Sequence, residues 1–201
     1  MRLIRGLHNL HHSQLGSALT IGNFDGLHRG HQAVLRHLQQ RAAERHLATT
    51  VMTFEPTAQE YFSPRTAPAR LQRLREKLAM LQALGVNQVH CLRFNQELAE
   101  LSADAFVRQI LVEGLDVRYL VVGDDFRFGK QRSGDFAFLQ QAGRRYGFEV
   151  VSTRTFLEGE GRVSSTRIRQ ALDEGDLAMA EQLLGRPYRI CGRVSPGQQR
   201  G

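Results

Sequence analysis

Two histidines spaced three residues apart end a glycine-rich segment near the start of the chain. This segment, Gly22–His31, reads GNFDGLHRGH and joins a predicted strand to a predicted helix. Its glycines let the backbone approach a ligand closely, and the helix start offers free N–H groups and a partial positive charge. His28 and His31 share one helix face and can donate hydrogen bonds to phosphate oxygens and to charge that grows during phosphoryl transfer. The spacing predicts a phosphate-binding turn.

Other interpretations of the same residues stay open. A plain glycine-rich turn with two surface histidines would have the same sequence. A zinc site is a further alternative, but no third or fourth ligand has suitable spacing nearby. The segment is neither a Walker P-loop, which ends in Gly-Lys-Ser/Thr, nor the dinucleotide fingerprint Gly-x-Gly-x-x-Gly.

A second group of candidate phosphate ligands lies late in the chain, where residues 163–169 read VSSTRIR. The hydroxyls of Ser164, Ser165 and Thr166 stand at a predicted helix start, where they can cap the helix or bond phosphate. Arg169 can bind phosphate as a bidentate donor. Taken alone, a Ser-Ser-Thr run favours ordinary capping.

Aromatic and acidic residues follow two other predicted strands. Gly123–Gly129 reads GDDFRFG, and Phe54-Glu55-Pro56 is followed by Tyr61 and Phe62. Aromatic walls suit a planar ring system, and polar groups could recognise its edge. Such aromatics are more often core residues, and paired aspartates more often belong to turns.

Alternating strands and helices must position these segments. The predicted strands are Ala18–Phe24, Leu47–Phe54, Gln88–Phe94, Arg118–Gly123 and Phe148–Ser152. The predicted helices cover about 30–45, Arg70–Leu84, Ala103–Glu113, Phe136–Tyr146, Thr166–Glu174 and Leu177–Leu184. This alternation predicts an α/β fold, a parallel sheet with helices on both faces. Ligands of such sheets bind beyond the carboxyl ends of the strands, which is where the three earlier segments lie.

Composition limits the classes of protein to consider. The formal net charge of +7 favours anionic partners, but no Lys/Arg block with interleaved aromatics indicates nucleic-acid binding. The apolar runs are too short to span a bilayer, and the N-terminus does not read as a signal peptide. Cys91 and Cys191 lack metal-ligand or redox spacing, so a cytoplasmic location is expected.

The two phosphate segments together resemble a known enzyme superfamily. A strand followed by Gly-x-Phe-Asp-Gly-x-His-x-Gly-His is similar to the ATP site of adenylyl- and cytidylyltransferases. In that superfamily a Ser-Ser-Thr-x-x-Arg segment late in the chain closes the ATP site. Both signatures occur here in that order, about 130 residues apart. Gly123–Gly129 resembles the flavin side of bacterial FAD synthetases, the adenylyltransferase module of bifunctional riboflavin kinase/FMN adenylyltransferases. The resemblance covers nearly all of residues 1–185 and implies a Rossmann-like nucleotidyltransferase fold.

The resemblance also implies roles for individual residues. His28 and His31 would contact the ATP phosphates and stabilise the transition state, and Arg169 would hold the pyrophosphate portion. The implied ATP-binding residues are Gly22, Asn23, Phe24, Asp25, Gly30, Ser164, Ser165 and Thr166. The implied residues for FMN and FAD are Phe54, Pro56, Asp124, Asp125, Phe126 and Phe128.

The implied reaction transfers AMP from ATP to FMN, giving FAD and pyrophosphate. Mg²⁺ would accompany ATP and keep several waters, so its protein ligands need not show in the sequence. ATP and FMN are the expected partners, without nucleic acid or membrane, and the sequence predicts no oligomeric state. The alternatives are a related adenylyltransferase that uses nicotinamide mononucleotide or phosphopantetheine, and a non-catalytic nucleotide- or RNA-binding module.

Two features depart from the family pattern. After Phe54-Glu55-Pro56 the family usually has a second proline, where this chain has Thr57 and Ala58. Residues 1–185 are expected to form the FMN adenylyltransferase domain, and residues 186–201 a linker with the truncated start of a riboflavin kinase-like module. Within them, Tyr188–Val194 is a predicted strand. Because the kinase barrel is missing from the sequence, we expect no phosphorylation of riboflavin.

Overall fold

A parallel sheet forms the centre of the molecule. The computed structural model describes residues 1–10, 15–153 and 163–192. Within them the strands are β1 Arg2–Arg5, β2 Ser17–Ile21, β3 Ala48–Phe54, β4 Gln88–Leu92, β5 Val117–Val122 and β6 Glu149–Ser152. The six strands run in the order β1-β4-β3-β2-β5-β6, and every neighbouring pair is parallel. All five residues of β2 are buried, as expected for a central strand covered on both faces.

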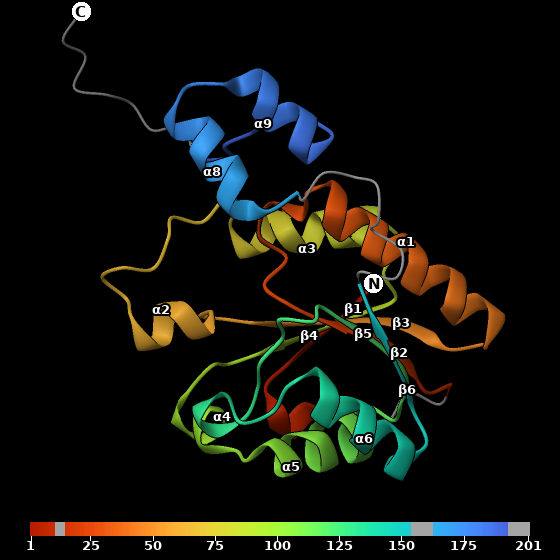
Figure 1. The fold of residues 1–201 in the computed structure, drawn as a ribbon. Coiled ribbons are helices and arrows are strands. Elements are labelled where there is room, and N and C mark those ends of the chain that lie inside the picture. The colour runs from red at the N-terminus through yellow and green to blue at the C-terminus, as the bar shows by residue number, and fades with distance from the viewer. Residues whose placement is uncertain (11–14, 154–162, 193–201) are drawn as a thin grey trace, which may run out of the picture.

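Helices cover both faces of the sheet, as Figure 1 shows. The helices α1 Arg29–Glu44 and α3 Leu74–Ala83 lie on one face, where Leu35 and Leu81 pack against Val51 and Val89. The other face carries α4 Gln96–Glu100, α5 Ala103–Ala105, the π-helical η3 Phe106–Gly114 and α6 Phe136–Tyr146. The predicted α/β fold is therefore confirmed.

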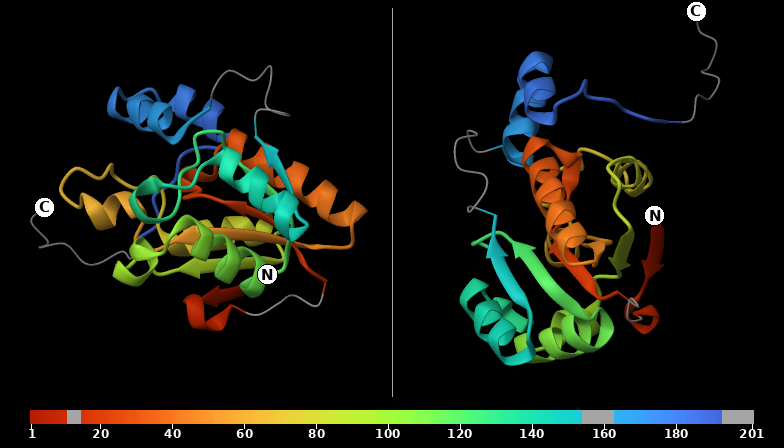
Figure 2. Two further views of the ribbon diagram at one scale, coloured as in Figure 1. Left: turned by 60° about the horizontal axis from the view of Figure 1, so that its bottom comes forward. Right: turned by 90° about the vertical axis from the view of Figure 1, so that its right-hand side faces the viewer.

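The last two helices form a separate small layer. Helices α8 Ser165–Asp173 and α9 Leu177–Leu184 stand beyond the start of α1 rather than against the sheet (Figure 2). Their buried residues Ile168, Leu183 and Leu184 pack on Leu71, which lies just before α3. The segment after strand β3 and the start of α8 thereby meet, although about 100 residues separate them in sequence.

Several elements differ from the sequence-based prediction. The first strand ends at Ile21 rather than at Phe24, because the backbone turns sharply from Gly22 onward. The exposed edge strand β1 was not predicted, nor were the short helices α4 and α2 Ala58–Phe62. The predicted strand Tyr188–Val194 is wrong in its described part, since residues 188–192 have no neighbouring strand to pair with.

Short 3₁₀ segments complete the described elements. They are η1 Leu7–Asn9, η2 Asp25–Leu27 and η4 Lys130–Arg132. Of these, η2 forms part of the glycine-rich turn between β2 and α1. None of the helices in the described ranges is long and apolar enough to cross a membrane.

Candidate active site

A cleft of about 760 Å³ opens at the carboxyl ends of β2 and β5. The chain leaves β2 towards β3 on one side, whereas β5 pairs with β2 on the other, so this is the point where the strand order reverses. Ligands of parallel α/β sheets bind at such points. Predicted site residues in its wall are Gly22, Phe24, His28, Gly30, His31, Asp124, Asp125, Ser164 and Ser165.

The turn that enters this cleft has an unusual backbone. Phe24 and Leu27 adopt positive φ angles of 48° and 41°, and Gly26 between them has a φ of 80°. Gly26 also has no room for a side chain, because an added Cβ would lie 2.8 Å from Leu71 Cδ1. Strained conformations of this kind persist only where the surroundings enforce them.

The two histidines of the turn form a stacked pair. Their ring centroids lie 3.6 Å apart and their planes differ by 15°. The backbone N–H of His31 donates to Nδ1 of His28, which makes His28 the N-cap of α1. Because Nδ1 accepts, the proton of a neutral His28 ring sits on Nε2, and this atom is the one available to donate.

Burial keeps both rings neutral. Desolvation lowers the pKa of His28 from 6.5 to about 4, although the nearby charge of Asp25 opposes the shift. Burial also lowers the pKa of His31 well below 6.5, and the charge of Lys77 adds to the effect. Nδ1 of His31 is buried without a hydrogen-bond partner. An incoming phosphate would supply the anionic partner that these desolvated rings lack.

A second helix start meets the first at the cleft. The side chain of Ser164 caps α8 by accepting the N–H of Arg167, and Ser165 Oγ donates to the Asp25 carbonyl over 2.9 Å. An added Cβ on Gly30 would lie 3.6 Å from the Val163 carbonyl oxygen, so the two helix starts approach closely. The positive ends of α1 and α8 therefore border one cleft, which suits a polyphosphate.

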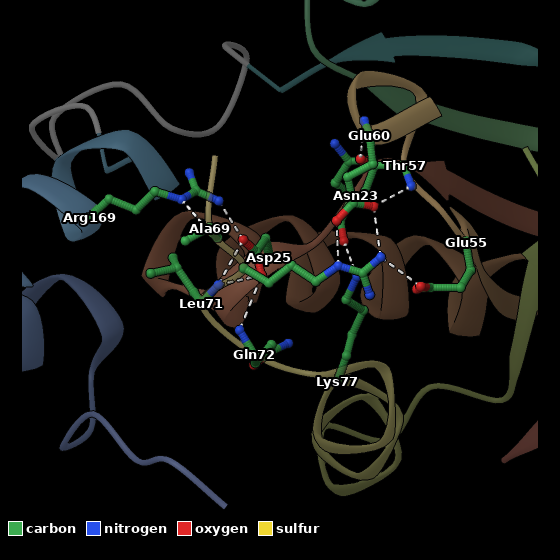
Figure 3. Close-up of polar contacts among 11 residues, drawn as sticks. Asn23, Asp25, Glu55, Thr57, Glu60, Ala69, Leu71, Gln72, Lys77 and Arg169 are labelled. Atoms are coloured by element: carbon green, nitrogen blue, oxygen red, sulfur yellow. Dashed lines mark hydrogen bonds and ion pairs between the residues drawn. The ribbon is translucent and has the colours of Figure 1, made fainter. Parts of the chain in front are cut away.

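Arg169 is not among the residues that line the cleft, and its role towards pyrophosphate stays a prediction. Its guanidinium donates to Asp25 Oδ2 over 2.5 Å and to the Ala69 carbonyl over 2.6 Å (Figure 3). Asp25 also accepts the backbone N–H groups of Leu71 and Gln72. Arg169 faces this carboxylate because α8 packs on the segment before α3. Asn23, Asp25 and Arg169 border a separate polar cavity of about 120 Å³.

The remaining predicted site residues lie in the cleft wall, in the core and on the surface of α8. Asp124 and Asp125 line the cleft, and Asp124 accepts a hydrogen bond from Ser152. Phe128 is buried in the core against Phe106, and its contact with the flavin stays a prediction. Phe126 stacks on Phe128 outside the cleft wall. Thr166 is exposed on α8.

An aromatic cluster lies at the ends of β3 and β4. Phe54 contacts Phe94 edge to face with 5.9 Å between centroids, and Tyr61 and Phe62 pack on the same Phe94 ring. Phe62 is 65% exposed, and Pro56 is half-buried beside this cluster in sequence. These aromatics do not border the main cleft. They stand on the β3 side of the turn, whereas Asp124 and Asp125 stand on the β5 side.

Several residues of the site region were missed by sequence reasoning. Thr20, Ile21 and Val122 also line the cleft, and they read simply as strand residues in the sequence. The wall further includes Val34, Gly123, Thr153 and Val163. Lys77 reaches from α3 to the Asn23 carbonyl over 2.6 Å. The only sequence signal for Lys77 is a charge within an amphipathic helix, which ordinarily indicates an exposed position.

Comparison with known proteins decides the family. A family model for FAD synthetase matches residues 10–167. The chain belongs to the FAD synthetase family. Relatives named bifunctional riboflavin kinase/FMN adenylyltransferase share 54% identity over 202 residues in Escherichia coli K12 and 52% over 201 residues in Haemophilus influenzae. Each alignment covers 100% of this chain and 64% or 65% of the relative. The chain thus spans slightly less than two thirds of these relatives.

The fold has a close counterpart among solved structures. The crystal structure of a protein described as a macrolide-efflux protein from Streptococcus pneumoniae superposes with a TM-score of 0.79 at 26% identity. The match covers 94% of this chain and 72% of the other. It supports the α/β architecture over most of the chain.

Proposed function

We propose that this chain transfers AMP from ATP to FMN, producing FAD and pyrophosphate. The observation that carries the proposal is the convergence of the His28–His31 turn and the Ser164–Ser165 helix start on one cleft. Membership of the FAD synthetase family supplies the acceptor. As the reaction draws on ATP and FMN, the proposal places the protein in the cytoplasm.

The proposed chemistry needs no protein nucleophile. An oxygen of the FMN phosphate, already ionised at neutral pH, forms a bond to the α-phosphorus of ATP. The bond from that phosphorus to the bridging oxygen breaks, and its electron pair leaves with pyrophosphate. The protein then acts mainly by positioning the reactants and stabilising charge.

Neutral imidazoles suit this role. His28 can donate from Nε2 to a phosphoryl oxygen while its Nδ1 stays engaged with the His31 N–H. A desolvated donor that is already oriented stabilises developing negative charge without reorganisation in the transition state. As charge builds up on the phosphoryl oxygens, it raises the proton affinity of both rings and strengthens these hydrogen bonds.

Phosphate binding in this proposal relies on helix starts and hydroxyls. No lysine or arginine is among the cleft-lining residues in the described part of the chain. Mg²⁺ on the ATP phosphates would supply the positive charge that the wall lacks. The described residues hold no group of three or more His, Cys, Asp or Glu side chains that could hold a metal ion. Asp124 is a carboxylate in the wall that could hold Mg²⁺.

The flavin ring is assigned to the β3 side of the turn. Phe54 is the last residue of β3 and Pro56 follows it, and the exposed Tyr61 and Phe62 offer aromatic faces there. A planar isoalloxazine ring can stack on such faces. Asp125 remains the predicted polar contact to FMN. Asp125 borders the same cleft as the residues assigned to ATP. Steady-state kinetics of an Asp125 variant therefore tests whether this residue contacts FMN or ATP.

One assay tests the proposal. The protein is incubated with ATP and Mg²⁺ plus FMN, nicotinamide mononucleotide, phosphopantetheine or riboflavin, and flavin products and pyrophosphate are measured. We expect FAD and equimolar pyrophosphate from FMN, and neither product from the other acceptors. Pyrophosphate release with another phosphorylated acceptor but not with FMN would replace the substrate assignment. FMN formed from riboflavin would refute the expected lack of kinase activity.

A further inference from the structure

Five consecutive backbone carbonyls of the turn are each held by a side chain from elsewhere in the fold. The carbonyl oxygens belong to residues 23–27. Their donors, in the same order, are Lys77, Gln72, Ser165, Arg186 and Gln32, at distances of 2.6, 3.3, 2.9, 2.8 and 2.9 Å. We name this set the carbonyl clamp.

The clamp lies behind the cleft. Of its five donors, only Ser165 is also part of the cleft wall. A carbonyl that turned into the cleft would present its negative end to the phosphates. Holding each carbonyl from behind therefore keeps the turn attractive to an anion and enforces the positive φ angles at Phe24, Gly26 and Leu27.

Lys77 differs from the other clamp donors because it is a buried charge. The residue is 5% exposed, and its ammonium donates to Asn23 from α3, as Figure 3 shows. Lys77 and Arg70 both border the cavity of about 120 Å³ that Asn23 also borders, but the Arg70 guanidinium already forms ion pairs with Glu55 and Glu60.

Composition makes this lysine more notable. Only two of the 27 basic residues are lysines, Lys77 and Lys130. Lys130 is exposed and pairs with Glu100 on the surface. A compact ammonium can reach one carbonyl through a narrow gap, whereas a planar guanidinium needs more room. Although nearly all other basic residues of the chain are arginines, position 77 holds lysine, whose ammonium group is smaller than a guanidinium.

Stability alone gives little reason for such a residue. Burial lowers the pKa of Lys77, so its charge is held at an energetic cost that the nearby Asp25 and Glu55 partly offset. An apolar side chain of similar length would avoid this desolvation and often preserves or improves stability at buried charged sites. The geometry thus favours a role in holding the turn.

We propose that Lys77 is a positioning residue for adenylyl transfer, which fixes the Asn23 carbonyl and thereby the turn that carries His28 and His31. The inference rests on the proposed function and adds to it a residue outside both phosphate signatures. Lys77 acts through the backbone and touches neither substrate.

The test compares Lys77→Met with a matched control, Lys130→Met, in steady-state FAD synthesis with ATP, Mg²⁺ and FMN. We expect Lys77→Met to lower kcat about 30-fold, because small misplacements of catalytic groups are costly, with both KM values changed less than about threefold. Its Tm should equal or exceed that of the wild type. Lys130→Met should keep the wild-type kcat. A kcat for Lys77→Met within about threefold of wild type would overturn the inference, and so would loss of folding, which would show a structural role.

A second readout separates this inference from the proposed function. Backbone amide resonances of residues 22–31 are compared by NMR in ligand-free wild-type, Lys77→Met and Lys130→Met proteins. We expect them to shift only in Lys77→Met. If they shift while the wild type makes no FAD, the enzymatic proposal fails and the structural role of the clamp stands. If they do not shift, Lys77 does not position the turn, whatever the activity.

Discussion

Individual residues of the turn serve two purposes at once. His28 caps α1 through Nδ1 and leaves Nε2–H for a ligand, so one ring satisfies the helix and supplies a donor. Asp25, which is predicted to contact ATP, accepts hydrogen bonds from Arg169 and from two backbone N–H groups. Residue type alone could not tell whether Asp25 contacts a ligand or holds the fold, because a carboxylate in a glycine-rich turn is compatible with both roles.

The histidine pair is expected to carry most of the charge stabilisation. Replacing His28 or His31 by alanine should lower kcat for FAD synthesis about 100-fold, since the loss of one preorganised donor commonly has that effect. The binding of FMN, measured by fluorescence, should change little. Activity of both variants within about threefold of wild type would contradict the electrostatic role.

Burial of neutral histidines predicts how stability depends on pH. The folded pKa of His28 is about 4, below the ordinary 6.5, so between these values the unfolded chain binds a proton that the folded protein does not. Stability should therefore fall as the pH decreases from about 6.5 to 4. His28→Asn keeps a capping acceptor but cannot titrate, so its midpoint of urea unfolding should fall less steeply with pH. An unchanged slope would show that His28 does not contribute.

Asp125 offers a test of the substrate assignment. Asp125→Ala should raise the KM for FMN about tenfold, as expected for a lost hydrogen bond to a bound ligand, with the KM for ATP nearly unchanged. Initial-rate kinetics with each substrate varied in turn would measure this. A change confined to the KM for ATP would move Asp125 to the ATP side of the cleft.

At the scale of elements, the junction of β2 and α1 is the critical feature. It combines positive φ angles with tight packing, and its carbonyls are held by α1, α3, α8 and the segments after β3 and α9. Short-range sequence patterns predicted the strand and the helix, but the shape of the turn depends on contacts that are distant in sequence.

Two glycines allow strain and packing to be separated. Gly26 and Gly175 have similar φ angles of 80° and 76°, but an added Cβ meets Leu71 at 2.8 Å in the first and nothing within 4 Å in the second. Gly175→Ala should lower the free energy of unfolding by about 1 kcal/mol through backbone strain. Gly26→Ala should lower it by about 2 kcal/mol more because of the clash. Equal losses in urea unfolding would contradict the packing argument.

At the scale of the whole molecule, the described segment after α9 is tied by hydrogen bonds to the turn between β2 and α1. Arg186 donates to the carbonyls of Gly26 and Leu184, and Gln32 also bonds Leu184. The predicted domain boundary after residue 185 stays a prediction, but this arginine links the two sides of it. Arg186 therefore joins the segment after α9 directly to the turn between β2 and α1.

Removal of this link should loosen the segment after α9. Arg186→Met should speed chymotrypsin cleavage after Tyr188 about tenfold, because the loss of charged hydrogen bonds favours local opening. Arg189→Met, a change at an exposed neighbouring arginine, should leave the cleavage rate as in the wild type. Equal rates in both variants would show that Arg186 does not anchor the segment.

The sequence by itself determined the α/β class and most helix and strand positions, because periodicity, glycines and helix caps are local properties. It also located the two candidate phosphate segments, whose phosphate contacts stay predictions. Only the tertiary structure decided which side chains share a cleft. Phe128 turned inward to the core and Arg169 to Asp25, while the unremarkable Lys77 reached the turn from another helix. Side-chain partners depend on how distant elements pack, and one-dimensional spacing does not carry that information.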